Sequence, residues 1–109
     1  MDKIYLITAI HISSKPIRKN YSLIKRSRAV GWFSTLDRAE EIVLNNEGGI
    51  YEGGHYDHCV IEEICSGLYP HVAMEEWFKW TKRKMIDYSG YIIIPKPEEL
   101  KGFINFSIG

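Results

Sequence analysis

The sequence predicts an α+β fold in which a small, mostly antiparallel sheet of about five strands has one helix packed on a face. Segments rich in β-branched and aromatic residues recur along the chain, which is typical of strands. A single segment has the apolar periodicity of an amphipathic helix, and short turns separate the later strands. The elements are therefore expected in the order strand, strand, helix, strand, strand, strand.

The first two predicted strands are Lys3–Ile12 and Arg28–Phe33. Lys3–Ile12 (KIYLITAIHI) is apolar on both alternating faces and contains no turn former, which indicates a central strand. Arg28–Phe33 is expected to pair with it in the antiparallel sense. Between them, Ser13–Ser27 contains Pro16, Asn20 and four serines, and this composition predicts a long loop or a loose hairpin tip.

The predicted helix covers Ser34–Asn46 (STLDRAEEIVLNN). Ser34 is the expected N-cap, and Asp37 stands three residues later as in a capping box. One apolar stripe gives the helix a single face to bury, and it consists of Leu36, Ala39, Ile42 and Val43. Asparagines and glycines follow, and these residues tolerate the left-handed conformation of a C-cap.

Three more strands are predicted after the helix. Gly49–His55 is rich in glycine and should be a turn region, followed by a strand at Tyr56–Cys65. Met74–Lys82 and Tyr88–Ile94 complete the set. Pro95 then ends the last strand, because proline cannot donate a hydrogen bond to a neighbouring strand.

Length and composition favour a single domain, residues 1–109, with one hydrophobic core. Hydrophobic residues make up 45% of the chain and charged residues 26%, as in ordinary globular proteins. Cys59 and Cys65 lie in one predicted strand, too far apart to form a disulfide. The chain shows no signal-peptide pattern and no apolar run of membrane-spanning length, so the cytoplasm is the predicted location.

Five runs cover most of the chain from residue 31 onward: GWFSTLDRAEEIVLNN, YDHCVIEEI, GLYP, EEWFKW and KPEELKGFINFSIG. They resemble a family of short uncharacterised proteins encoded by bacteriophages and by mobile elements of gut bacteria. The resemblance implies a phage or mobile-element setting. No catalytic motif is assigned to the family, and no cofactor is predicted for this chain. By analogy with other small phage proteins, it suggests a counter-defence inhibitor or a ligand sponge.

Basic and acidic residues are segregated along the chain, although their totals, fourteen each, cancel. No acidic residue occurs from Lys3 through Leu36, whereas eight carboxylates and one basic residue, Arg38, occur from Asp37 through Glu63. Guanidinium groups bind phosphates bidentately, and aromatic rings stack on nucleobases. The candidate ligand-binding residues are therefore Lys15, Arg18, Lys19, Tyr21, Lys25, Arg26, Arg28 and Trp32.

These residues predict a non-catalytic binding protein that holds an anionic partner through a basic loop between residues 15 and 28. The partner is a nucleotide, a nucleic acid or a host defence protein, and homo-oligomerisation through an edge strand is compatible with the pattern. One alternative is that the basic segment is merely solvated or pairs with the acidic helix. Another is a protein–protein interaction module that binds through an apolar patch.

Histidines raise the questions of a metal site and of catalysis. His55, His58 and Cys59 offer donor atoms that suit zinc, but His58 and Cys59 would point to opposite faces of a strand, so no metal site is predicted. His11 and Ser13 match half of the paired H-x-S/T pattern of two-histidine phosphoesterases. A small nuclease or phosphodiesterase that uses His11, His55 or His58 is therefore the alternative function. The second half of the pattern is absent from the sequence, so an enzyme is not the leading expectation.

Overall fold

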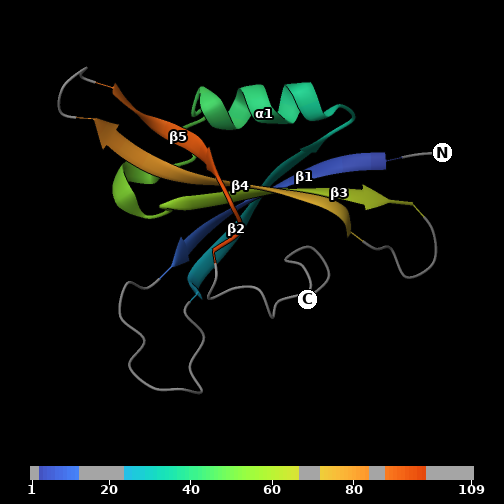
Figure 1. Cartoon of the computed structure of the whole chain (residues 1–109), viewed down its shortest axis with the longest axis horizontal. Coiled ribbons are helices and arrows are strands. Elements are labelled where there is room, and N and C mark those ends of the chain that lie inside the picture. The colour runs from blue at the N-terminus through green and yellow to red at the C-terminus, as the bar shows by residue number, and fades with distance from the viewer. Residues whose placement is uncertain (1–2, 13–23, 67–71, 84–87, 98–109) are drawn as a thin grey trace.

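The computed structural model describes residues 3–12, 24–66, 72–83 and 88–97, in which five antiparallel strands form one sheet and one α-helix lies over it (Figure 1). The elements are β1 (Lys3–Ile12), β2 (Ile24–Phe33), α1 (Leu36–Leu44), the short 3-10 helix η1 (Glu52–Gly54), β3 (His58–Cys65), β4 (Val72–Arg83) and β5 (Tyr88–Ile94). The predicted α+β class and the order of strands and helix are confirmed. Within these ranges no helix has the length and apolar character needed to cross a membrane.

The strands lie side by side in the order β2-β1-β3-β4-β5, and every neighbouring pair is antiparallel. β1 has a neighbour on each side, as its apolar residues on both faces predicted. The predicted bounds of β1 and β5 agree with the structure residue for residue. β2 and β5 form the two edges of the sheet.

The main correction to the predicted elements concerns the start of β2. This strand begins at Ile24, whereas the sequence pattern placed the residues up to Ser27 in a loop. Lys25 and Arg26 therefore lie in a strand, and Arg26 pairs with His11 of β1. Pairing with β1 imposes the strand conformation that these polar residues do not favour by themselves. Four predicted site residues lie outside the described part of the chain: Lys15, Arg18, Lys19 and Tyr21.

α1 also differs from its prediction, because its N-cap is Thr35 and not Ser34. Thr35 has the extended backbone of a cap residue, with φ −130° and ψ 145°. Its hydroxyl accepts a hydrogen bond from the backbone N–H of Arg38 at 3.3 Å. At the other end, the backbone N–H of Asn45 donates to the carbonyl of Glu41 at 3.0 Å.

The hydrophobic core lies between α1 and one face of the sheet. α1 contributes the buried residues Ala39, Ile42 and Val43. The sheet contributes Ile7, Ala9, Cys59, Ile61, Phe78 and Tyr91. On the opposite face, a smaller buried cluster consists of Ile10, Val60 and Trp77. Side chains on both faces of the sheet are therefore buried, which explains why β1 carries apolar residues on both faces.

Aromatic side chains fasten the segment between α1 and β3 to the sheet. The Tyr51 ring stacks on Trp80 with their centroids 3.9 Å apart, and both rings meet Tyr91 edge-on. The Tyr91 hydroxyl donates a 2.6 Å hydrogen bond to the carbonyl of Tyr56. Burial raises the pKa of Tyr91 well above its usual value, so the hydroxyl keeps the proton that it donates. These contacts hold the turn that carries His55.

Candidate functional site

The predicted site residues that the structure describes lie on two faces of β2. Arg26 pairs with His11 of β1 and Arg28 with Ala9, whereas Trp32 pairs with a β1 residue of the other face. Ala9 belongs to the core beneath α1, so the two arginines lie on the α1 side of the sheet. Trp32 is 62% exposed on the opposite side. The predicted combination of these arginines with the neighbouring tryptophan is therefore not formed.

Arg28 has partners within the molecule. Its guanidinium forms an ion pair with the Glu52 carboxylate and lies over the Tyr56 ring, 5.1 Å from the ring centroid. Glu52 belongs to η1 and has a positive φ of 48°, which is uncommon for a residue other than glycine. With its charge paired and one face covered by a ring, Arg28 has little to offer an external anion.

Arg26 lies at a small cleft together with two histidines. The cleft has a volume of about 280 Å³ and is lined by His11, Arg26, Gly53, Gly54 and His55. Arg26 Nη1 lies 2.7 Å from His55 Nδ1. The described residues that line the cleft include no carboxylate, so Arg26 contacts an imidazole ring instead of an acid.

The cleft exists because the chain turns sharply before β3, as the glycine content of Gly49–His55 predicted. Gly53 and Gly54 have φ values of 64° and 114°, and the second of these lies beyond the region that other residues tolerate. The backbone N–H of Tyr56 donates to the carbonyl of Tyr51 at 3.2 Å and closes the turn. The turn brings His55 back to Arg26 on the edge strand.

Asp57 does not line the cleft but contacts His11, which does. Its Oδ1 accepts a 3.1 Å hydrogen bond from the backbone N–H of Ile12, and it lies 3.1 Å from His58 Nδ1 and 3.5 Å from His11 Nδ1. Its carbonyl accepts a 2.8 Å hydrogen bond from the backbone N–H of Trp80. Burial alone would raise the pKa of Asp57, but the hydrogen bonds from His58 and Ile12 and the charges of both histidines outweigh burial and lower it. The ionised carboxylate therefore holds His11 at the cleft.

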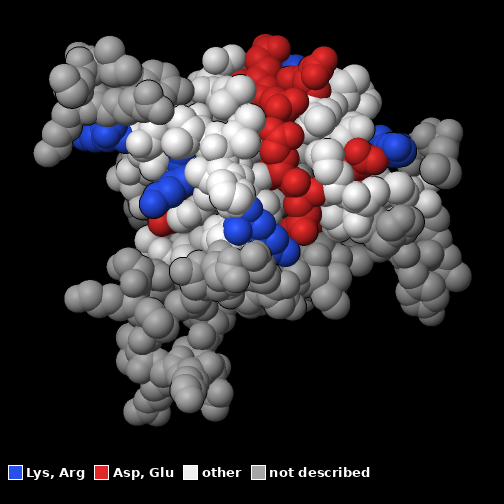
Figure 2. All heavy atoms as spheres, viewed as in Figure 1, with Lys and Arg blue, Asp and Glu red and all other residues white. Residues whose placement is uncertain are grey.

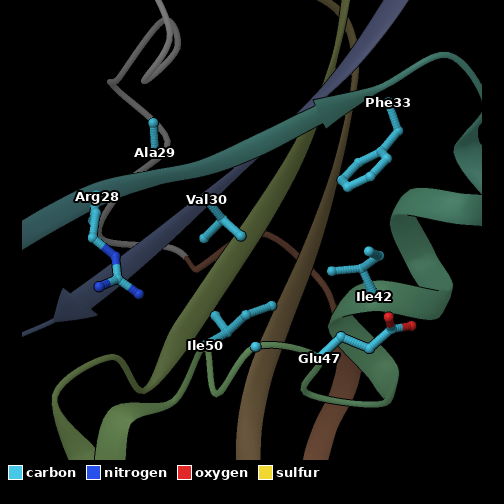
Figure 3. Close-up of a pocket in the computed structure, with 8 residues that line it drawn as sticks. Arg28, Ala29, Val30, Phe33, Ile42, Glu47 and Ile50 are labelled. Carbon is cyan, nitrogen blue, oxygen red and sulfur yellow. The ribbon is translucent and has the colours of Figure 1, made fainter.

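A larger cavity between β2 and the end of α1 has a different chemistry (Figure 3). Its volume is about 430 Å³, and it is lined by Arg28, Ala29, Val30, Phe33, Ile42, Glu47, Gly48 and Ile50. Figure 3 shows apolar side chains from β2 and α1 turned toward it. Both charged lining residues have internal partners, since Arg28 pairs with Glu52 and Glu47 accepts hydrogen bonds from Arg38 at 3.1 and 3.3 Å. This cavity therefore does not suit the predicted anionic ligand.

Acidic side chains gather in a band that runs from α1 across the sheet (Figure 2). Burial, followed by the hydrogen bond and the charge of Glu40 in α1, raises the pKa of Glu76 in β4 to about 7. The neighbouring Glu75 instead pairs with Lys96 at 3.3 Å. Across the described ranges, no three His, Cys, Asp or Glu side chains are grouped as a metal site.

His58 and Cys59 point to opposite faces of β3, as their adjacent positions predicted. His58 is 8% exposed and faces Asp57, whereas Cys59 is fully buried in the core beneath α1. Burial raises the pKa of the Cys59 thiol to about 12, so the thiol is protonated and not nucleophilic. Cys59 and Cys65 are both free thiols, as predicted.

Separate features of the sequence indicate His11, Arg26 and His55 as candidates, and none of these features predicts that they line one cleft. Their meeting depends on the pairing of His11 with Arg26 and on the glycine turn before His55. The glycine pair was the available signal, because a turn with two glycines can reverse the chain tightly. The strand register that places Arg26 opposite His11 has no comparable local signal.

No protein-family model matches this chain, and comparisons with curated proteins and with solved structures also give no match. The resemblance to short phage proteins therefore stays a prediction from the sequence. One fold supports many unrelated functions, so the residues of the cleft and not the fold indicate the function.

Proposed function

We propose that this protein binds an anionic partner that carries phosphate groups, at the cleft lined by His11, Arg26 and His55. The contrast between the two arginines of β2 is the observation that supports this function best. Arg28 has a carboxylate partner in Glu52, whereas Arg26 contacts a histidine ring. A guanidinium that keeps its charge beside two imidazoles can offer several hydrogen bonds to one phosphate.

The basic residues between β1 and β2 extend the proposal. Lys15, Arg18 and Lys19 belong to the segment that joins Ile12 to Ile24, and these two end residues pair with each other. The segment therefore starts and ends near the cleft, and its positive charges attract phosphates. Together with the resemblance, this favours a nucleotide or a nucleic acid as the partner, bound without turnover in a counter-defence role.

Fluorescence anisotropy with a labelled single-stranded RNA oligonucleotide tests the proposal. We expect Arg26→Ala to weaken binding by about tenfold or more, because a hydrogen bond to a charged group contributes about 1.5–3 kcal/mol. The matched control combines Arg28→Gln with Glu52→Gln, which removes an exposed ion pair at constant net charge and should change affinity by less than about threefold. Circular dichroism verifies that each variant is folded. Equal affinity of wild-type and Arg26→Ala protein would reject the proposal.

The salt dependence of the same binding reaction distinguishes phosphate contact from an apolar interface. Binding to phosphates should weaken steeply as the salt concentration rises, and Arg26→Ala should reduce the slope by about one. Affinity that is insensitive to salt would instead favour a protein–protein interaction module that binds through an apolar patch.

One observation favours a second candidate function, phosphodiester cleavage. His11 Nδ1 faces the Asp57 carboxylate, which favours a proton on Nδ1 and leaves Nε2 as an acceptor. Such an imidazole can act as the base and take the proton of a ribose 2′-hydroxyl, while another group acts as the acid and protonates the leaving oxygen. Denaturing gels of the same RNA would then show products with wild-type protein and none with His11→Ala protein. Intact RNA after prolonged incubation would exclude cleavage and leave binding as the function.

A further inference from the structure

The contact between Arg26 and His55 defines the protonation state of this histidine in the free protein. A guanidinium carries N–H donors and no acceptor, so Arg26 Nη1 must donate and His55 Nδ1 must accept across the 2.7 Å between them. An imidazole that accepts at Nδ1 carries its proton on Nε2 and is neutral. His55 is therefore neutral, with its lone pair directed at Arg26.

A phosphate bound in the cleft would require His55 Nδ1 to donate a hydrogen bond and not to accept one. Phosphate oxygens are acceptors, so the lone pair of His55 Nδ1 would face them unfavourably. A protonated His55 would instead add a second charge-assisted hydrogen bond beside that of Arg26. Imidazole is the side chain that ordinarily gains or loses a proton between roughly pH 5 and 8, so this exchange is available near neutral pH.

We infer that the cleft is a site for a single phosphate group and that binding is coupled to the uptake of one proton by His55. This inference rests on the proposed function. It specifies the ligand class, a phosphate group, and the residue whose protonation changes on binding, His55. In the free protein Arg26 donates to His55, and in the complex both side chains donate to the phosphate. His55 thus exchanges an acceptor role for a donor role.

The charged and titratable groups near His55 are consistent with this exchange. Arg26 of β2 and His11 of β1 line the cleft with it. Glu52 of η1 and Asp57 before β3 are the nearest acids along the chain. Neither acid lines the cleft: Glu52 pairs with Arg28, and Asp57 contacts the backbone N–H of Ile12 and the rings of His58 and His11. Within the described residues, the cleft therefore contains no carboxylate that would take the place of the phosphate.

The size and lining of the cleft favour one phosphate group over a larger ligand. Its volume of about 280 Å³ is below the range of roughly 300–1,000 Å³ that is typical of sites enclosing a drug-sized ligand. The side chains that line it come from β1, β2 and the turn before β3. Arg26 and a protonated His55 belong to two different elements, so their hydrogen bonds can reach different oxygens of a tetrahedral phosphate, whereas one guanidinium fork already matches a planar carboxylate.

Isothermal titration calorimetry tests the coupling, with a short DNA oligonucleotide carrying a 5′-phosphate as the probe. DNA lacks the 2′-hydroxyl, so the suggested cleavage cannot interfere. Titrations near pH 7.5, in two buffers with different ionisation enthalpies, give the number of protons taken up on binding. We expect about one proton for the wild-type protein and about zero for His55→Gln, because glutamine donates a hydrogen bond without binding a proton. His71→Gln, at a histidine outside the described residues, is the matched control and should keep the wild-type value.

Nitrogen-15 NMR of the histidine rings gives an independent readout. His55 Nδ1 should carry no proton in the free protein and should gain one in the complex. The same oligonucleotide without its 5′-phosphate identifies the source of the bound group. Proton uptake with both probes would assign internal phosphodiesters, and uptake with the phosphorylated probe alone would assign a terminal phosphate.

The failure of this inference can be distinguished from the failure of the proposed function. Binding that depends on Arg26, but takes up equal numbers of protons in wild-type and His55→Gln protein, would overturn the inference and leave the proposed function intact. Binding that does not depend on Arg26 would overturn both.

Discussion

Arg26 and Arg28 lie on the same face of β2 and have different partners in the fold. Glu52 reaches Arg28 from η1, and the glycine turn that follows brings His55 to Arg26. Exposed ion pairs contribute little to stability, so the pair of Arg28 matters mainly because it occupies the guanidinium. Arg28 meets an acid from this turn and is paired within the molecule, whereas Arg26 meets a histidine and can still bind a ligand.

Asp57 is the residue whose replacement should disturb the cleft most. Asp57→Ala removes the acceptor for the Ile12 N–H and the contacts to both histidines, so we expect the free energy of unfolding to fall by roughly 2 kcal/mol. Asp57→Asn keeps an oxygen for Ile12 but loses the charge, and its cost should be about 1 kcal/mol. Urea denaturation at neutral pH measures both values. Equal losses of unfolding free energy in the two variants would show that the hydrogen bond from the Ile12 N–H contributes nothing to stability.

The residues of the site could be predicted only in part. Residue types and charge segregation identify Arg26 and His11 as candidates, and the same reasoning identifies Arg28 equally well. The sequence also allows the basic segment to pair with the acidic helix, whereas Arg28 pairs with Glu52 of η1, outside that helix. Which arginine pairs with an acid depends on contacts between distant parts of the chain, and no local pattern encodes these.

Strands whose neighbours and burial match their local pattern could be predicted well. β1 and β5 are apolar, rich in β-branched residues and bounded by turn formers, so their bounds follow from the sequence. Lys25, Arg26 and Ser27, which follow Ile24 at the start of β2, are polar or basic, and they adopt the strand conformation because β1 lies beside them. A pairing of this kind is a property of the sheet and not of the segment.

The cap of α1 offers a direct test at the scale of one element. Ser34 and Thr35 are both good N-cap residues, and the spacing to Asp37 favoured the first, whereas the structure uses the second. Thr35→Ala should lower the free energy of unfolding by about 1 kcal/mol, because the Arg38 N–H loses its acceptor. Ser34→Ala is the matched control and should change it by no more than a few tenths. A larger loss for Ser34→Ala in urea denaturation would contradict the observed cap.

The charges of the whole molecule cancel, but two of its acids affect stability in different pH ranges. The pKa of Asp57 is lowered in the folded protein, so Asp57 stabilises the fold above its usual pKa of 3.8, and this contribution is lost as the pH falls through the folded value. The pKa of Glu76 is raised from 4.5 to about 7. The folded protein therefore keeps a proton there that the unfolded chain releases, and stability declines as the pH rises through this window. The highest stability is expected between the two ranges, in mildly acidic solution.

Glu76→Gln tests the upper part of this pH profile. The variant removes the repulsion between two carboxylates, so its free energy of unfolding at pH 8 should exceed the wild-type value by roughly 0.5–1 kcal/mol, a figure reduced for partial exposure. At pH 5 the gain should disappear. Glu75→Gln is the matched control, because Glu75 pairs with Lys96, and it should show no gain at pH 8. A gain that is the same at both pH values would contradict the proposed cause.

The class of the fold could be predicted from the sequence, whereas the assembly of the sheet could not. One clear amphipathic helix and several short strands are enough to indicate an α+β architecture. The pairing of β1 with β3 joins segments that are far apart along the chain, across β2 and α1. It is decided by burial on both faces of the sheet, which becomes visible only when all the strands are in place.

The cleft joins parts of the chain that only the folded sheet brings together, with Asp57 bonded to β1 through its side chain and to β4 through its backbone. The unfolded chain lacks the cleft, so a ligand bound there stabilises only the folded protein. It adds RT ln(1 + [L]/Kd) to the free energy of unfolding. Proteases act on unfolded chains. The lifetime of the protein in a cell should therefore lengthen wherever its partner is abundant.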